Sequence, residues 1–147
     1  MIRVGCIGAG MIAQRGHIPG YLESGRAKLV AVADPLENRV KEVAKRFGAE
    51  AWYTDWRDLI KRKDIQAVSV CTPNKYHAPV TIAAHKAGKH VLVDKPMAVT
   101  MKEVRDMVQA AKRKKLFLMV NQSYRFYPET EVAKDILNKG LLGRIHT

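Results

Sequence analysis

Five short apolar runs divide the chain, and a stretch in which apolar residues recur at helical spacing follows each of the first four. The runs cover residues 2–7, 29–33, 67–70, 90–93 and 116–120. A continuous apolar run of about four to eight residues is typical of a strand that is buried on both faces of a parallel sheet. Alternation of such strands with helices predicts an α/β fold with a doubly wound parallel sheet and right-handed crossovers.

A glycine-rich turn follows the first apolar run, with the pattern Gly8-x-Gly10-x-x-Ala13. Gly8 permits the tight turn, Gly10 leaves room for a pyrophosphate, and the small Ala13 lets the helix pack on the strand. Free N–H groups and the helix dipole favour an anion there. Met11 and Ile12, which begin the helix, belong to the same predicted cofactor loop.

Polar residues stand directly after the other apolar runs, where each predicted strand ends. In an open α/β sheet, ligands bind beyond the carboxyl ends of the strands. The residues in question are Asp34, Thr72-Pro73-Asn74, Asp94-Lys95-Pro96 and Asn121. Because these ends share one edge of the sheet, we expect all of them in a cofactor site together with the glycine turn.

Asp34 is the predicted partner of the adenosine ribose, since it lies 26 residues after Gly8, close to the spacing of the dinucleotide fingerprint. Its carboxylate accepts hydrogen bonds from ribose hydroxyls and repels a 2′-phosphate. The neighbouring Pro35 supplies no basic group, so the sequence favours NAD over NADP. The alternative is that Asp34 caps the helix that follows.

Lys95 is the candidate catalytic residue. A lysine at a strand end beside a nicotinamide can bond a substrate hydroxyl and help carry its proton as the hydride leaves. Pro96 fixes a tight turn that aims Lys95, and the bond between them can be cis. The alternative is an ordinary surface lysine in a lysine-rich chain.

His77 stands near a predicted helix start beside Thr72-Pro73-Asn74, so it either approaches the cofactor or plays a structural role. The remaining histidines show no metal-ligand spacing, and the two cysteines form no CxxC motif, so no metal site is predicted. Cys6 and Cys71 both fall at predicted strands, which favours buried free thiols in a reducing cytoplasm.

The order of these motifs resembles the Gfo/Idh/MocA oxidoreductases, which include glucose–fructose oxidoreductase and inositol dehydrogenases. The matching pieces are Gly8 to Ala13, Ala33-Asp34-Pro35, Cys71-Thr72-Pro73-Asn74 with His77, Ala87-Gly88-Lys89-His90-Val91, Asp94-Lys95-Pro96, Asn121, Arg125-Phe126 and Gly140 to Ile145. The run from Ala87 to Val91 that leads to the Lys-Pro pair is the most specific of them.

This resemblance implies an N-terminal NAD-binding Rossmann domain over residues 1–121. Residues 122–147 would begin the connection to a C-terminal α+β domain that shapes a sugar or polyol pocket and often forms a dimer interface. By the same resemblance Lys95 contacts nicotinamide ribose and substrate, and Asp94 replaces the family's usual Glu. The family's other catalytic residues come from the second domain, so we expect this chain to bind cofactor with little or no turnover.

The length of 147 residues and the net charge of +12 limit the remaining alternatives. No apolar run is long enough to span a membrane. The basic runs at 61–63 and 112–115 lie at predicted helix ends and lack interleaved aromatic residues, which favours a solvated surface over a nucleic-acid partner. A non-catalytic NAD-binding or redox-sensing module remains the alternative to an enzyme.

Overall fold

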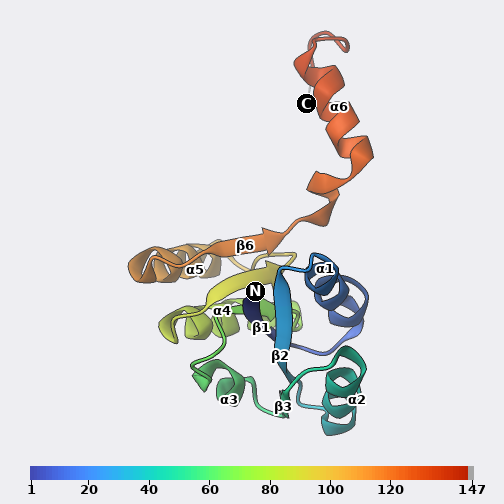
Figure 1. The fold of residues 1–147 in the computed structure, drawn as a ribbon. Coiled ribbons are helices and arrows are strands. Elements are labelled where there is room, and N and C mark those ends of the chain that lie inside the picture. Colours follow the sequence, from blue (N-terminus) through green and yellow to red (C-terminus); the bar gives the residue numbers. More distant parts are fainter. Residues whose placement is uncertain (146–147) are drawn as a thin grey trace.

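One parallel sheet of six strands organises the computed structural model, which describes residues 1–145 (Figure 1). The strands are β1 (Ile2–Ile7), β2 (Ala27–Ala33), β3 (Ala51–Tyr53), β4 (Ala67–Val70), β5 (His90–Asp94) and β6 (Leu118–Asn121). They lie in the order β3-β2-β1-β4-β5-β6, and every neighbouring pair is parallel. The order reverses between β1 and β4, which is the switch point where doubly wound sheets bind ligands.

Helices cover both faces of the sheet, so the structure confirms the predicted doubly wound α/β fold. They are η1 (a π-helix, Ala13–His17), α1 (Ile18–Glu23), α2 (Glu37–Phe47), α3 (Trp56–Lys61), η2 (3₁₀, Asn74–Tyr76), α4 (His77–Lys86), α5 (Met101–Lys114), η3 (3₁₀, Ser123–Phe126) and α6 (Pro128–Asn138). One core layer packs α1 and α2 on the sheet, and the other packs α3, α4 and α5 on its opposite face.

β3 was not among the five predicted strands. It has only three residues, Ala51–Tyr53, and they are half-buried or exposed rather than fully buried. Its residues pair with β2 from Ala31 to Ala33. The strand is stabilised at this edge by pairing and packing rather than by an apolar run of its own. It therefore extends the site edge to residue 54 and beyond.

The helix ends follow local chemistry. Gly48 ends α2 in the left-handed conformation with φ of 69°. The side chain of Asp55 accepts a hydrogen bond from the Arg57 N–H at the start of α3. Thr100 and Glu103 form a capping box at the start of α5. Pro19 lies in the first turn of α1, where a missing N–H costs little.

Lys89 is buried at the end of the sheet opposite the glycine turn. Its ammonium group donates hydrogen bonds to the carbonyl oxygens of Arg62 and Ile65 at 2.6 and 2.8 Å. Burial lowers the pKa of this ammonium group, although Asp64 partly offsets the effect. The most family-specific run of the sequence therefore contributes a structural tie and not a site residue.

The segment from 122 to 145 extends away from the sheet and carries α6 (Figure 1). Every residue in it is exposed except the half-buried Ile136. The exposed apolar side chains include Tyr124, Phe126, Tyr127, Leu141 and Leu142. Such a set of unburied apolar side chains is typical of a surface that packs against another part of a protein.

Candidate cofactor site

The predicted site residues follow one row of the sheet register. Ile7 pairs with Ala33 on one side and Val70 on the other, and the row continues through Val93 and Val120. The next residues along the strands are Gly8, Asp34, Cys71, Asp94 and Asn121. The structure therefore brings the strand-end residues to a single edge, as their positions in the sequence predict.

The two glycines of the turn are needed for different reasons. Gly8 has φ of +94°, and a Cβ there would lie 2.5 Å from the carbonyl oxygen of Cys71. Gly8 thus allows β1 and β4 to approach at the switch point. Around Gly10 a Cβ would meet nothing within 4 Å, so the space above it is open. That open backbone suits the close approach of a phosphate group.

The turn leads into a helix whose start is accessible. Met11 and Ile12 are exposed, whereas Ala13 is fully buried against the sheet. The structure therefore confirms the predicted packing role of Ala13. The N–H of Ala9 donates to the carboxylate of Asp34 at 2.8 Å, so this amide of the turn is already paired.

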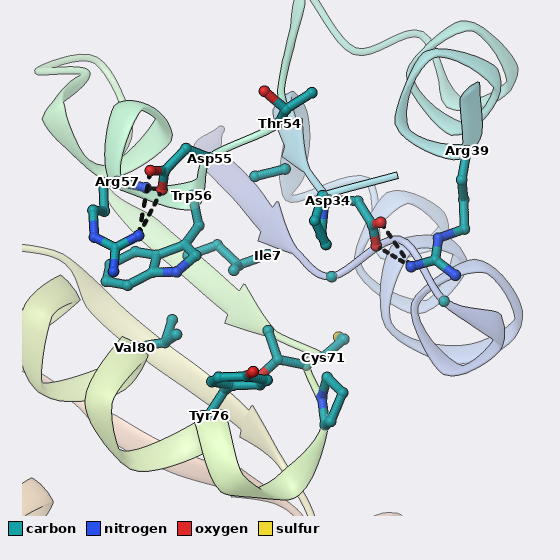
Figure 2. A pocket seen from close by; sticks show the side chains of 16 residues that line it. Ile7, Asp34, Arg39, Thr54, Asp55, Trp56, Arg57, Cys71, Tyr76 and Val80 are labelled. Carbon is teal, nitrogen blue, oxygen red and sulfur yellow. Dashed lines mark hydrogen bonds and ion pairs between the residues drawn. The ribbon is translucent and has the colours of Figure 1, made fainter. Parts of the chain in front are cut away.

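A cavity of about 560 Å³ opens beside the turn (Figure 2). Of the predicted site residues, it is lined by Gly8, Gly10, Asp34, Thr72 and Pro73. The other predicted site residues do not line this cavity; they are Met11, Ile12, Asn74, His77, Asp94, Lys95, Pro96 and Asn121. The predicted residues therefore divide between this cavity and the neighbouring ends of β5 and β6.

Asp34 is the most constrained charged group of the cavity. Its carboxylate accepts hydrogen bonds from the backbone N–H groups of Ala9 and Leu36. The Arg39 guanidinium contacts both of its oxygens at 2.7 and 2.8 Å. The contact with Leu36, the N-cap residue of α2, shows that Asp34 also shapes the helix entry.

Aromatic side chains that the sequence analysis did not select form the far wall of the cavity. Figure 2 shows Trp56 next to Arg57 and Asp55, and Tyr76 below them. The Arg57 guanidinium lies 4.7 Å from the ring centre of Trp56 and pairs with Asp55. A hydrogen bond from the backbone N–H of Arg57 lowers the pKa of the Asp55 carboxyl, and a hydrogen bond from the Arg57 guanidinium lowers it further. A planar aromatic base suits such a wall.

Thr72 and His77 occupy different environments at the end of β4. Thr72 lines the cavity, and its hydroxyl is shielded from solvent and has no hydrogen-bond partner among residues 1–145. His77 is buried, and its ring nitrogens lie 2.7 Å from the Pro96 carbonyl oxygen and 2.8 Å from that of Thr72. Its ring thus ties the loop after β4 to the turn after β5.

Lys95 and Pro96 form the exposed turn after β5, and the peptide bond between them is cis. Within the described residues the Lys95 ammonium makes no hydrogen bond or ion pair. Asn74 is likewise exposed. Asp94 turns inward, and its carboxylate lies 3.5 Å from Nε2 of His17.

His17 lies at the centre of a buried polar cluster that the sequence did not predict. Nδ1 lies 2.6 Å from the Ser69 hydroxyl, and Nε2 lies 2.9 Å from the side-chain nitrogen of Asn121. Burial by itself lowers the pKa of His17, but the Cys71 sulfur and the Asp94 carboxylate outweigh burial and raise it. Hydrogen bonding with the free thiol of Cys6 and burial raise the pKa of the Cys71 thiol, whereas His17 lowers it in part.

Two sequence signals could have found the missed residues. Recognising 51–53 as a strand places Thr54, Asp55 and Trp56 at the site edge. Arg39 lies five residues after Asp34 on the first turn of α2, from which its side chain returns to that carboxylate. His17 offers no comparable signal, because its partners come from three other strands.

Comparison with known proteins identifies the family to which the chain belongs. A model of the Gfo/Idh/MocA proteins, described as an oxidoreductase family with an NAD-binding Rossmann fold, matches residues 2–122. The chain belongs to this family. Levoglucosan dehydrogenase from Pseudarthrobacter phenanthrenivorans is 42% identical over 118 residues, which cover 80% of this chain and 30% of that protein. D-glucoside 3-dehydrogenase from Escherichia coli is 31% identical over 99% of this chain and 41% of its own length.

Solved structures of relatives superpose over nearly the whole chain. Levoglucosan dehydrogenase in complex with NADH gives a TM-score of 0.89 at 35% identity and covers 98% of this chain and 41% of its own. A 3-ketoreductase from Actinomadura kijaniata, in complex with NADP and TDP-benzene, gives 0.90 at 31% identity over 95% of this chain and 43% of its own. The chain thus spans well under half the length of these relatives.

Within the described part of the chain, no helix is long and apolar enough to cross a bilayer. No group of three or more His, Cys, Asp or Glu side chains in residues 1–145 is arranged to hold a metal ion.

Proposed function

We propose that this chain is the cofactor-binding domain of an NAD-dependent oxidoreductase that transfers a hydride at a secondary alcohol of a sugar, polyol or related compound. The observation that carries the proposal is the open backbone of Gly10 beside a cavity that holds Asp34 and the unpartnered Thr72 hydroxyl. The sugar and polyol dehydrogenases among the relatives support the substrate class.

In this proposal the cavity holds the adenosine half of the cofactor. Asp34 faces the ribose, the wall of Trp56 and Tyr76 faces the base, and the open turn at Gly10 faces the pyrophosphate. NAD, when bound, supplies the hydride acceptor. Met11, Ile12, Pro73 and Asn74 border the phosphate path, and His77 acts by holding the loop that carries Thr72.

The nicotinamide half then lies toward the ends of β5 and β6, with Pro96 and Asn121 beside it. Lys95 anchors the substrate hydroxyl and relays its proton, which an ammonium group without a fixed partner can do. We assign residues 1–121 to the cofactor domain and residues 122–147 to the start of the connection to a substrate domain, which would also mediate oligomerisation. The two free cysteines fit a reducing cytoplasm.

Calorimetric titration of the chain with NAD tests this proposal directly. We expect saturable binding with one site per chain and no turnover of sugars or polyols by the chain alone. Absence of NAD binding would sink the proposal. Replacing Thr72 by Val is the matched probe, because it keeps the shape of the side chain and removes a hydroxyl that has no hydrogen-bond partner among residues 1–145. We expect weaker NAD binding and unchanged thermal stability.

A further inference from the structure

Arg39 and Asp34 form a close ion pair inside the cavity. A single guanidinium nitrogen of Arg39, Nη2, lies 2.7 Å from one carboxylate oxygen of Asp34 and 2.8 Å from the other. The Asp34 side chain is 2% exposed, whereas that of Arg39 is 40% exposed. The carboxylate is therefore fixed in place, and the guanidinium is the partner that is free to move.

The hydrogen bonds of Asp34 leave no acceptor site unused. A carboxylate offers about four lone-pair positions. The N–H groups of Ala9 and Leu36 occupy one on each oxygen, and both belong to the backbone framework. The Arg39 nitrogen occupies the remaining one on each oxygen. A ribose diol that binds Asp34 must therefore displace Arg39, because these two positions are the only ones that can be exchanged.

The charge of the cavity also differs from what Asp34 alone implies. Its charged side chains are Asp34, Arg39, Asp55 and Arg57, two of each sign. The acids and bases are paired with each other, so the cavity wall is electrically neutral overall. A 2′-phosphate that enters such a cavity does not meet an uncompensated carboxylate. It meets the Arg39 side chain, which is 40% exposed and carries N–H donors besides the Nη2 that bonds Asp34.

We propose that Arg39 is the specificity-determining residue for the adenosine end of the cofactor and that it lets this site accept NADP as well as NAD. With NAD, Arg39 withdraws and the ribose diol takes its two positions on Asp34. With NADP, Arg39 stays beside Asp34 and binds the 2′-phosphate through its remaining N–H donors, because guanidinium recognises phosphate well. The inference rests on the proposed cofactor function and adds the 2′-phosphate as a ligand of the same site.

The experiment compares calorimetric titrations of NAD and NADP with the wild-type chain and with Arg39→Gln. We expect wild type to bind both nucleotides with dissociation constants within about tenfold of each other. Arg39→Gln should weaken NADP by at least about tenfold, the usual scale for a lost charge-assisted pair. The variant should bind NAD as tightly as wild type or more tightly, because Arg39 no longer competes with the ribose for Asp34.

Arg46→Gln is the matched control, since it makes the same charge change on the same helix at an exposed residue that does not line the cavity. This control should bind NAD and NADP with affinities within about twofold of wild type. Thermal melting followed by circular dichroism checks that each variant is folded. NAD binding without NADP binding in wild type, or an equal loss of both nucleotides in Arg39→Gln, would overturn the role of Arg39.

A second measurement needs no variant. Adenosine 2′,5′-bisphosphate and adenosine 5′-monophosphate differ only in the 2′-phosphate, and each can compete with NAD for wild type. We expect the bisphosphate to compete at least as well as the monophosphate, and a bisphosphate that is more than about tenfold weaker contradicts the inference. If neither NAD nor the monophosphate binds, the proposed function itself fails, which separates that outcome from failure of the Arg39 assignment alone.

Discussion

Nε2 of His17 lies 2.9 Å from the side-chain amide nitrogen of Asn121, which stands 104 positions later in the chain. His17 ends the π-helix that follows the glycine turn, and Asn121 ends β6. The same ring contacts Ser69 of β4 and approaches Asp94 of β5. One buried imidazole therefore joins the helix after the glycine turn to three strand ends of the site edge.

His17→Ala should lower the free energy of unfolding by about 2–4 kcal/mol, because it leaves a cavity and removes the partner of buried polar groups. Urea denaturation of the chain measures the loss. Gln122→Ala, an exposed neighbour of Asn121, is the control and should change stability by no more than about 0.5 kcal/mol. A loss below about 1 kcal/mol in His17→Ala would show that the cluster contributes little to the fold.

The two glycines of the turn should separate stability from binding. Gly8→Ala combines a φ of +94° with a Cβ that meets the Cys71 carbonyl, so we expect a loss of about 3 kcal/mol or more. Gly10→Ala meets no atom within 4 Å and should keep wild-type stability. Its Cβ enters the space proposed for the pyrophosphate, so NAD binding should weaken by at least about tenfold.

Urea denaturation and calorimetry on both variants decide this pair. Equal loss of stability in Gly8→Ala and Gly10→Ala would contradict the different roles assigned to them. Wild-type NAD affinity in Gly10→Ala would remove the phosphate from this part of the loop.

The fold could be predicted largely from continuous apolar runs, because a strand buried on both faces needs one. β3 escaped this criterion, since its three residues lie at the sheet edge and are half-buried or exposed. The site edge could be predicted for the same reason as the fold, because parallel strands end together. Trp56 was not selected because it follows the strand that was missed.

Side-chain pairing was the part that sequence reasoning could not supply. Pro35 offers no cation to Asp34, as predicted, but α2 returns Arg39 to the same carboxylate. His77 was predicted either to approach the cofactor or to play a structural role, and the structure places its ring between two carbonyl oxygens. Such contacts depend on rotamers and on chain geometry after folding, and neither is visible in residue spacing.

Lys89 carries a prediction about stability alone. Lys89→Met keeps the apolar stem and removes the ammonium group that bonds the Arg62 and Ile65 carbonyls. Two buried carbonyl groups lose their donor, so we expect the free energy of unfolding to fall by about 2–3 kcal/mol. Lys86→Met, at an exposed position of α4, should be neutral. Both variants should bind NAD as wild type does, because Lys89 lies at the opposite end of the sheet.

The charged cluster at that end of the sheet should make stability sensitive to acid. Hydrogen bonds from Lys28 and then Arg3 lower the pKa of Glu50 to about 2, and bonds from Arg62 and Arg3 lower the pKa of Asp64. A lowered folded-state pKa stabilises the protein above the ordinary glutamate value of about 4.3. This stabilisation disappears as the pH falls from there toward 2.

Glu50→Gln tests this dependence. At neutral pH, about 7, carboxylates are ionised, and the variant should have a lower free energy of unfolding than wild type. This difference in the free energy of unfolding should disappear as the pH falls toward 2. Glu42→Gln, an exposed carboxylate on α2, should follow the wild-type profile throughout. Urea denaturation across this pH range gives the profiles. A stability gap that stays constant with pH would show that the charge of Glu50 is not the cause.

Lys95 carries the chemical prediction, which applies to an enzyme in which a substrate domain follows this chain. Lys95→Met keeps the length of the side chain and removes an ammonium group that has no fixed partner among the described residues. If Lys95 holds the substrate hydroxyl and relays its proton, kcat should fall by at least about 10²-fold, the scale of general acid–base catalysis. The affinity for NAD should change by no more than a few fold, because the cavity proposed for the adenosine half does not include Lys95. Lys102→Met, which removes an exposed lysine on α5, is the control and should retain wild-type kcat. Steady-state kinetics with NAD titration measures both quantities, and a proportional loss of kcat and NAD affinity would assign Lys95 to cofactor binding instead of proton transfer.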